Sequence, residues 1–549
     1  MKHFGIFLAF PPLVDLRSQG LGRYLAMFLK GGEEIPDIRF TIVCPSWNKE
    51  ALIELFRSER VPLHAFDIIS PEGKPFALRI FEALKTYRGR GGRRAEWVVR
   101  LAGSAKELSL ACLKHLMRRA VQVHDLASAV KFFLQSFIAL PIAVVSLLVL
   151  GVFYCVRYIS VLSQALALRL LSSTSAQIKQ AITKFLAYPQ NQDWVVQLFD
   201  EMQRHEIERM LRKIGELSKV QAWYCPTAFW PEFQSINKPR LLCVPDVVLS
   251  DFPVGFSRVN GDRFLSVFKN VEDAIANGER FVTYSENVKW GTLVDRYSIA
   301  EGDVSVIRHA PNTLHQYVSV SGFADSEAAS QHMCSVWLRQ AFQRSTNAIY
   351  TSDFRNNRLK FIFYASQFRP NKNILVLLRA FDFLLRKRFI GYKLIMTGNP
   401  IHLPEVGDFV RNSGLERDVI FLREISVSEL AACYKLADLA VNPTLSEGGC
   451  PFTFTEALSV GTPVVMSRIP VAEEVLTDPV LQEMTFFDPY DWRDCAKRIE
   501  WALGHREELL ATQRKTYAQL SQRTWTDVVN EHIRVLEEIS TPDLKDAVV

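Results

Sequence analysis

Apolar residues recur along the chain in short runs that end at glycine, proline or small polar residues. Residues 3–10 and 39–46 are two such runs, and the segment Gly-Leu-Gly-Arg-Tyr at 20–24 opens an apolar helical pattern between them. A strand, a glycine loop, a helix and a second strand form a βαβ unit with parallel strands. Further strands in the first 350 residues are predicted at 220–226, 240–244, 280–284 and 303–307.

A second alternation of strands and helices begins near residue 350. It predicts strands at 359–364, 392–397, 419–422, 439–442 and 463–466. It predicts helices at 374–388 and 428–437, a third helix starting near 454, and a last amphipathic helix at 525–539. Strands that alternate with helices over this length are typical of a doubly wound parallel sheet.

The segment between the first strands and residue 190 does not follow this alternation. Its first part carries many lysines and arginines, and residues 132–156 then contain no charged side chain. A helix of that length spans a hydrocarbon layer of ~30 Å. A shorter apolar stretch follows at 158–168. We expect a membrane-associated helical insertion here; the alternative is a buried hairpin inside a soluble protein.

The predicted sheet limits how this insertion meets a membrane. Strands before and after it share one sheet, so both flanks must lie on the same side of the bilayer. The insertion therefore crosses an even number of times, enters and returns, or lies in the interface. The preceding basic residues favour the cytoplasmic face, with residues 132–168 as the membrane contact.

These patterns predict three regions. Residues 1–84 and 191–345 form a first Rossmann-like lobe, against which a helix at 522–540 packs. The helical insertion occupies 85–190, and a second Rossmann-like lobe occupies 346–521. The N-terminal run has the character of a buried strand and lacks the features of a signal peptide.

Composition adds the cellular setting. The 549 residues are 48% hydrophobic and 23% charged, with a net charge of +6. The nine cysteines are odd in number and include no CxxC pair, which favours a reducing compartment over a disulfide framework or zinc site. The basic cluster adjoins an apolar run and lacks interleaved aromatic residues, so nucleic-acid binding is not expected.

The segment 442–465 carries the most specific chemistry. A strand ends, the pair Gly448-Gly449 turns the chain, and a helix begins after Pro451. Glycines expose backbone N–H groups, and the helix N-terminus adds partial positive charge suited to a diphosphate. Glu447 can accept hydrogen bonds from sugar hydroxyls, and Glu456 from the two ribose hydroxyls. The alternative is an ordinary turn with a helix-capping glutamate.

A second segment, 364–373, places Arg369 and Lys372 between a strand and a helix. Two cations at a strand end can neutralise a departing diphosphate, and this kind of electrostatic stabilisation is often the largest catalytic contribution. The alternative is a solvated basic loop.

Both segments resemble the donor-binding signature of the family-4 (group 1) retaining glycosyltransferases. The resemblance implies a GT-B fold, in which two Rossmann-like lobes face a cleft. It implies that Arg369 and Lys372 hold the donor diphosphate, and that Glu447, Gly448, Gly449, Cys450, Pro451 and Glu456 line the donor site. Arg369 resembles the variant of lipid-linked-oligosaccharide mannosyltransferases. Eight residues separate Glu447 from Glu456, where the family has seven.

The first lobe carries weaker parts of the same resemblance. The loop with Gly20, Gly22 and Arg23 is similar to the family's first-lobe glycine loop, and Ser285 and His309 fall in similar strand-end segments. The resemblance implies that these five residues contact the substrates; the alternative for His309 is a structural histidine. The family commonly has a His-Asp pair near the cleft, where this chain has Pro245-Asp246. Either catalysis depends on another group, or the alignment with the family is displaced at this position.

Together these features predict a retaining glycosyltransferase. It would move a hexose, mannose being one candidate, from a nucleotide-diphosphate sugar to a glycan or lipid-linked acceptor at the cytoplasmic face of a membrane. The donor is a substrate, and neither a cofactor nor a metal is expected, since no metal-ligand spacing occurs. The alternatives are a non-catalytic GT-B scaffold in a polysaccharide-assembly complex, or a GT-B epimerase or phosphorylase.

Overall fold

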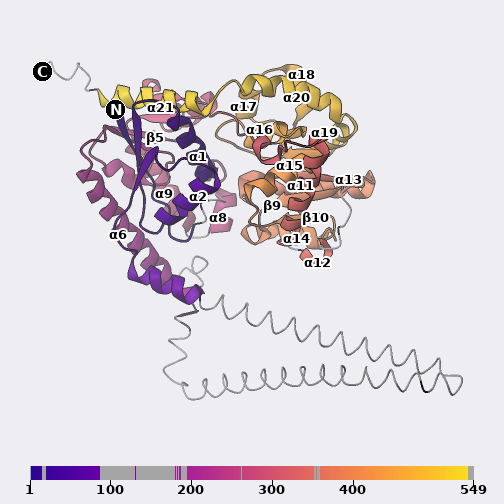
Figure 1. The fold of residues 1–549 in the computed structure, drawn as a ribbon, viewed down its shortest axis with the longest axis horizontal. Coiled ribbons are helices and arrows are strands. Elements are labelled where there is room, and N and C mark those ends of the chain that lie inside the picture. Colours follow the sequence, from indigo (N-terminus) through magenta and orange to yellow (C-terminus); the bar gives the residue numbers. More distant parts are fainter. Residues whose placement is uncertain are drawn as a thin grey trace. The chain divides into compact units, whose positions relative to one another are not determined.

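The computed structural model divides the chain into two compact units, Met1–Pro71 with Glu206–Val549, and Glu72–His205. It describes residues 2–14, 16, 20–86, 130, 180, 182–183, 185–186, 194–260, 263–345, 347–351, 354 and 359–541 (Figure 1). The apolar stretch at 132–168 therefore lies outside the described residues. Among the helices that are described, none combines the length and apolar character needed to span a membrane.

The first sheet of the larger unit has seven parallel strands in the order β3-β2-β1-β4-β5-β6-β7. The strands are β1 (Lys2–Phe7), β2 (Ile38–Val43), β3 (Phe66–Ile69), β4 (Ala222–Cys225), β5 (Arg240–Cys243), β6 (Phe281–Thr283) and β7 (Val304–Val306). Buried aromatic and aliphatic side chains fill these strands, as expected for a parallel sheet covered on both faces.

Helices and short helical turns connect these strands. They are α1 (Gly20–Glu33), α2 (Lys49–Ser58), α6 (Trp194–Glu216), η2 (Pro231–Ser235), α7 (Val248–Asp251), α8 (Pro253–Asn260), α9 (Arg263–Ala276), the π-helix η3 (Val288–Val294) and η4 (Glu301–Asp303). In α1, Tyr24, Leu25, Phe28 and Leu29 are buried on one face, while Lys30 lies in the last turn. This periodicity packs α1 on the sheet with its first turn at the carboxyl end of β1.

The second sheet has six parallel strands in the order β10-β9-β8-β11-β12-β13. They are β8 (Phe361–Tyr364), β9 (Lys393–Thr397), β10 (Val419–Leu422), β11 (Leu439–Asn442), β12 (Val464–Ser467) and β13 (Phe486–Phe487). Because side chains alternate across a strand, Phe361 and Phe363 join one apolar core, while Ile362 and Tyr364 join another on the opposite face.

Helices cover both faces of this second sheet. They are α10 (His315–Val318), α11 (Ser326–Phe342), α12 (Ala348–Thr351), η5 (Pro370–Lys372), α13 (Ile374–Lys387), η6 (Pro400–His402), α14 (Pro404–Asn412), α15 (Val427–Leu436), α16 (Phe452–Ser459), α17 (Pro470–Val475), α18 (Pro479–Thr485), α19 (Trp492–Gly504) and α20 (Arg506–Leu520). The prediction of two doubly wound parallel sheets, the basis of the GT-B fold, is confirmed. The helical membrane insertion stays a prediction.

The last helix, α21 (Trp525–Ser540), returns to the first sheet. Its buried face, Val528, Val529, Ile533 and Leu536, belongs to the apolar core of that sheet. A capping box between Thr524 and Asp527 fixes where the helix starts.

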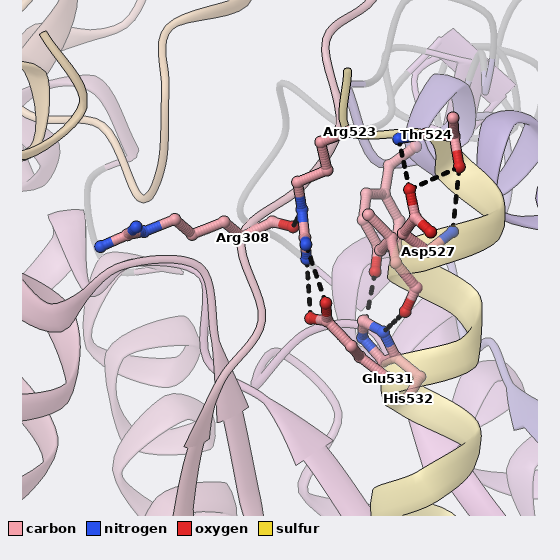
Figure 2. A network of polar contacts seen from close by, with 8 residues as sticks. Arg308, Arg523, Thr524, Asp527, Glu531 and His532 are labelled. Atoms are coloured by element: carbon pink, nitrogen blue, oxygen red, sulfur yellow. Dashed lines mark hydrogen bonds and ion pairs between the residues drawn. The ribbon is translucent and has the colours of Figure 1, made fainter. Parts of the chain in front are cut away.

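Polar contacts fix the start of α21 in place (Figure 2). Arg523 donates two hydrogen bonds to the Glu531 carboxylate, at 2.8 and 2.7 Å, and its Nε donates to the Arg308 carbonyl at 2.8 Å. Further along, the buried His532 ring lies 3.4 Å from the Tyr24 hydroxyl of α1. These contacts join the end of the chain to strands and helices that precede it by hundreds of residues.

The smaller unit is described only in part. Residues 76–86 are helical, and Phe81 packs against Phe185 and Phe199 with ring centroids 5.3 and 5.5 Å apart. Lys74 forms an ion pair with Glu82 at 3.4 Å.

Candidate active site

The residues singled out from the sequence follow the carboxyl ends of strands in both sheets. In open parallel sheets this edge is where ligands bind, because loops and helix N-termini converge there. Arg369 and Lys372 follow β8, Glu447 follows β11, and Glu456 lies in α16. In the first sheet, Ser285 follows β6 and His309 follows β7.

The loops after β8 and β11 pack against each other. The Leu445 amide donates to the Asn371 carbonyl at 2.8 Å, and the Thr444 hydroxyl donates to the same oxygen at 3.3 Å. Lys372 Nζ forms an ion pair with Glu447 Oε1 at 2.6 Å, and both side chains are about one-fifth exposed. Two residues that the sequence predicts in the donor site are therefore in direct contact.

Arg369 belongs to the same cluster. Its guanidinium donates a hydrogen bond to Gln367 Oε1 at 2.8 Å. Although Arg369 keeps an exposed surface, partial desolvation of its guanidinium lowers its pKa, while the nearby carboxylates of Asp246 and Glu447 act in the opposite direction. An arginine has so high an ordinary pKa that it remains a cation at neutral pH. The cluster therefore offers two positive charges to an anionic ligand.

Asp246 completes this cluster from the first lobe, and sequence reasoning gave it no role. It follows β5, and its half-buried carboxylate interacts electrostatically with Lys372, Glu447 and Arg369. Burial raises the pKa of Asp246, partly offset by Lys372. The sequence did contain a signal for this role: Asp246 lies just beyond the carboxyl end of a central strand, in the Pro245-Asp246 pair that stands where the family commonly has His-Asp.

The glycine loop after β11 meets the first lobe closely. A Cβ atom built on Gly448 would overlap the Pro245 carbonyl oxygen, and one on Gly449 would lie 2.7 Å from His309 Nε2. The Ser285 hydroxyl donates to the Gly448 carbonyl at 3.1 Å. In this structure Ser285 and His309, predicted as substrate contacts, lie against the loop itself.

His309 sits in an aromatic setting. Its ring centroid lies 4.4 Å from that of Phe452 and 5.4 Å from that of Tyr284. Burial lowers the pKa of His309 to about 4, so the imidazole is neutral at pH 7. Its Nδ1 has no hydrogen-bond partner among the described residues.

Cys450 and Pro451 lead into α16. Burial, with a smaller contribution from Glu447, raises the pKa of the Cys450 thiol to about 12. The thiol is therefore uncharged and is not a nucleophile at neutral pH. Pro451 is the N-cap residue of α16 and provides no side-chain hydrogen bond to the first turn.

Glu456 lies in α16 and contacts the first lobe. Its Oε1 forms an ion pair with Arg23 Nη1 of α1 at 2.8 Å and lies 3.5 Å from Asn312 Nδ2. Gly20 begins α1, and Gly22 approaches the Leu16 carbonyl so closely that a side chain would overlap it. Arg23 therefore belongs to the predicted glycine loop of the first lobe, and it contacts Glu456, the residue predicted to bind the ribose hydroxyls.

Glu474 of α17 also joins the two sheets, although the sequence resemblance gave it no role. Its carboxylate accepts hydrogen bonds from the Glu286 and Asn287 amides, both at 3.1 Å, and from Arg308 Nη2 at 2.9 Å. These contacts anchor the segment that leads into η3.

The second sheet and its helices are similar to a known protein family. The family model described as glycosyl transferases group 1 matches residues 349–520. This lobe is a group 1 glycosyltransferase domain. The sequence resemblance to that family is therefore confirmed, and the matched region contains Arg369, Lys372, Glu447 and Glu456.

Two curated relatives share part of this region. The O-antigen chain mannosyltransferase RfbU of Salmonella typhimurium is 32% identical over 163 residues, which is 28% of this chain and 43% of that protein. The alpha-monoglucosyldiacylglycerol synthase of Streptococcus pneumoniae is 31% identical over 113 residues, or 21% of this chain and 25% of that protein. The chain thus spans less than half the length of these relatives.

A solved structure shares the fold over nearly the whole chain. The N-terminal domain of Candida albicans trehalose-6-phosphate phosphatase has a TM-score of 0.53 and 11% identity, covering 98% of this chain and 97% of that one. At this identity the similarity concerns the fold alone.

Proposed function

We propose that this protein is a retaining glycosyltransferase that moves a hexose from a nucleotide-diphosphate sugar to a glycan or lipid-linked acceptor at the cytoplasmic face of a membrane. The observation that carries this proposal is the cluster of Lys372, Arg369, Glu447 and Asp246 at the strand ends of a group 1 glycosyltransferase domain. The names of the two relatives, an O-antigen chain mannosyltransferase and a monoglucosyldiacylglycerol synthase, support a hexose donor and a polysaccharide or lipid acceptor.

The cations would act on the leaving group. As the bond between the sugar and the diphosphate breaks, negative charge grows on the diphosphate, and Lys372 and Arg369 would stabilise it. An ammonium group has three donors, so Lys372 can hold Glu447 and a phosphate oxygen together. The N-terminus of α16, beyond Gly448 and Gly449, would add backbone N–H groups toward the same charge.

Glu447 would bind the sugar. Its contact with Lys372 fixes the carboxylate beside the two cations proposed to bind the diphosphate, where it can accept hydrogen bonds from sugar hydroxyls. A fixed sugar and a neutralised leaving group let an acceptor hydroxyl attack from the face that the diphosphate leaves. The protein's share of catalysis is then positioning and charge stabilisation.

The membrane part of the proposal rests on the sequence. Residues 132–156 carry no charge and follow a basic segment, which is the pattern of a stretch that contacts the cytoplasmic leaflet. A membrane-associated enzyme would meet lipid-linked or growing polysaccharide acceptors there.

Nucleotide binding tests the proposal directly. We would record thermal unfolding of the detergent-solubilised protein with UDP, GDP, ADP and their common sugar conjugates. A ligand that binds only the native state stabilises it by ~2.7 kcal/mol at a hundredfold excess over its dissociation constant. We expect one nucleotide series to raise the melting temperature.

Variants locate the site. Lys372→Ala and Glu456→Ala should abolish the shift, while Lys387→Ala, at an exposed position in the last turn of α13, should retain it. A folded wild-type protein that responds to none of these ligands at millimolar concentration would contradict the proposal and favour the non-catalytic scaffold.

A further inference from the structure

The surroundings of Glu456 come from both lobes. Glu456 is 3% exposed in α16, yet both hydrogen-bonding partners of its Oε1 belong to the first lobe: Arg23 in α1 and Asn312 after β7. A carboxylate this buried needs a counter-charge, because an isolated buried charge is strongly unfavourable. Arg23 supplies it.

Arg23 is well suited to remain charged at this position. Burial acts to lower the pKa of Arg23, but Glu456 and Glu59 outweigh it and the pKa is raised. Glu59 is itself buried at the end of α2 and receives a hydrogen bond from the Tyr317 hydroxyl at 3.4 Å. The guanidinium is therefore paired with Glu456 of the second lobe and also interacts electrostatically with Glu59 of the first lobe.

Unused hydrogen-bonding capacity remains beside Glu456. A carboxylate has about four lone-pair sites, so Oε1 and Oε2 can accept further donors while Arg23 stays in place. Asn312 is 2% exposed and directs Nδ2 to Glu456, and its Oδ1 has no hydrogen-bond partner among the described residues. Arg23 Nε is likewise buried without one. Unsatisfied buried polar atoms in a native structure call for an explanation.

We propose that Arg23 and Asn312 complete a ribose subsite around Glu456, so that both lobes recognise the sugar of a nucleoside diphosphate. This rests on the proposed function. Each ribose hydroxyl is a donor and an acceptor. The 2′ and 3′ hydroxyls would donate to Glu456 and to Asn312 Oδ1, and one of them would accept from Arg23 Nε. Arg23 acts partly as a positioning residue, since it orients and neutralises Glu456.

Discrimination between ribose and 2′-deoxyribose tests this subsite. The probes are UDP, GDP and ADP, each compared with its 2′-deoxy counterpart by isothermal calorimetry on the full-length protein. A buried site built to bind a hydroxyl rejects the analogue that lacks it, here by an expected factor of roughly tenfold to a hundredfold. Arg23→Gln and Asn312→Leu should each reduce this ratio to less than about threefold.

Controls separate this role from general stability. Arg57→Gln removes an exposed arginine from α2 of the same lobe and should leave the ratio unchanged. Because Arg23→Gln leaves a buried carboxylate without its counter-charge, Arg23→Lys and the double variant Arg23→Gln/Glu456→Gln are measured as well. Arg23→Lys should recover part of the discrimination, and adding Glu456→Gln to Arg23→Gln should cause little further loss of it.

The outcomes are distinct. If the wild-type protein binds no ribonucleoside diphosphate, the proposed function fails. If it binds one and prefers ribose, but the Arg23 and Asn312 variants keep the wild-type ratio, the subsite is overturned and the proposed function stands. The subsite would also be overturned if Arg23→Gln bound the ribonucleotide and its 2′-deoxy counterpart more tightly and to the same extent. Arg23 would then compete with the ligand.

Discussion

At the scale of single residues, Gly448 shows how closely the donor loop approaches the first lobe. Any side chain at this position would overlap the Pro245 carbonyl oxygen, which is backbone and cannot rotate away. We expect Gly448→Ala to cost about 1–3 kcal/mol of stability, typical of overpacking, and to weaken nucleotide binding. Thermal unfolding with and without nucleotide measures both effects.

The control for this variant is Gly504→Ala in the same lobe. Open space surrounds Gly504 at the end of α19, so the substitution should not lower the melting temperature and should leave nucleotide binding unchanged. Wild-type behaviour of Gly448→Ala would show that the loop can move away from Pro245 at little cost.

The buried His532 should make the stability of the protein depend on pH. Burial lowers its pKa to about 4, whereas an unfolded histidine titrates near 6.5. Between these values the unfolded state binds more protons, so the free energy of unfolding decreases as pH falls from about 6.5 to about 4. The decrease is on the order of 3 kcal/mol for this one residue.

Urea unfolding at pH 7 and pH 5 measures this effect. His309, with a pKa also near 4, contributes in the same direction, so His532→Gln should reduce the pH dependence without abolishing it. An unaltered pH dependence in His532→Gln would contradict the assignment.

At the scale of elements, α21 belongs to the first lobe although it ends the chain. Leu536 is fully buried in the core of the first sheet, and Trp525 crowds Gly31 of α1. Replacing a buried leucine by alanine removes apolar contacts and leaves a cavity, which costs about 2–5 kcal/mol. We therefore expect Leu536→Ala to lower the stability of the first lobe by this amount.

Denaturant unfolding, followed by intrinsic tryptophan fluorescence, tests this expectation. Arg534→Ala, on the exposed face of the same helix, controls for helix propensity and should be nearly neutral. A Leu536→Ala variant as stable as the control would mean that α21 contributes little to the core.

At the scale of the whole molecule, the predicted membrane contact at 132–168 would determine which acceptors the proposed enzyme reaches. We expect the full-length protein to float with vesicles that contain anionic lipids. The pair Val144→Asp/Leu148→Asp should reduce flotation strongly, because charged side chains are costly in hydrocarbon. The matched pair Val144→Leu/Leu148→Val should float like the wild type.

These results would separate two properties of the chain. Loss of flotation with retained nucleotide binding would assign the membrane contact to the insertion alone. Flotation of the aspartate variant at the wild-type level would exclude residues 132–168 as the main contact.

The length of a strand decided whether the sequence predicted it. Strands of the second sheet such as Val419–Leu422 and Leu439–Asn442 were predicted with their observed bounds, because continuous apolar runs between turn residues leave few alternatives. β3 and β13 were not predicted. β3 has four residues, including Asp67 paired with Arg39, and β13 has two, so neither is long enough to show a periodicity.

The sequence by itself determined two parallel α/β lobes and the loops that carry Arg369, Lys372, Glu447 and Glu456, because these follow from local patterns of apolar, glycine and charged residues. Only the tertiary structure placed Asp246 among those charges and paired Arg23 with Glu456. Such contacts join segments far apart in the chain. Their partners depend on how the strand ends of the two sheets meet, and no local pattern contains that information.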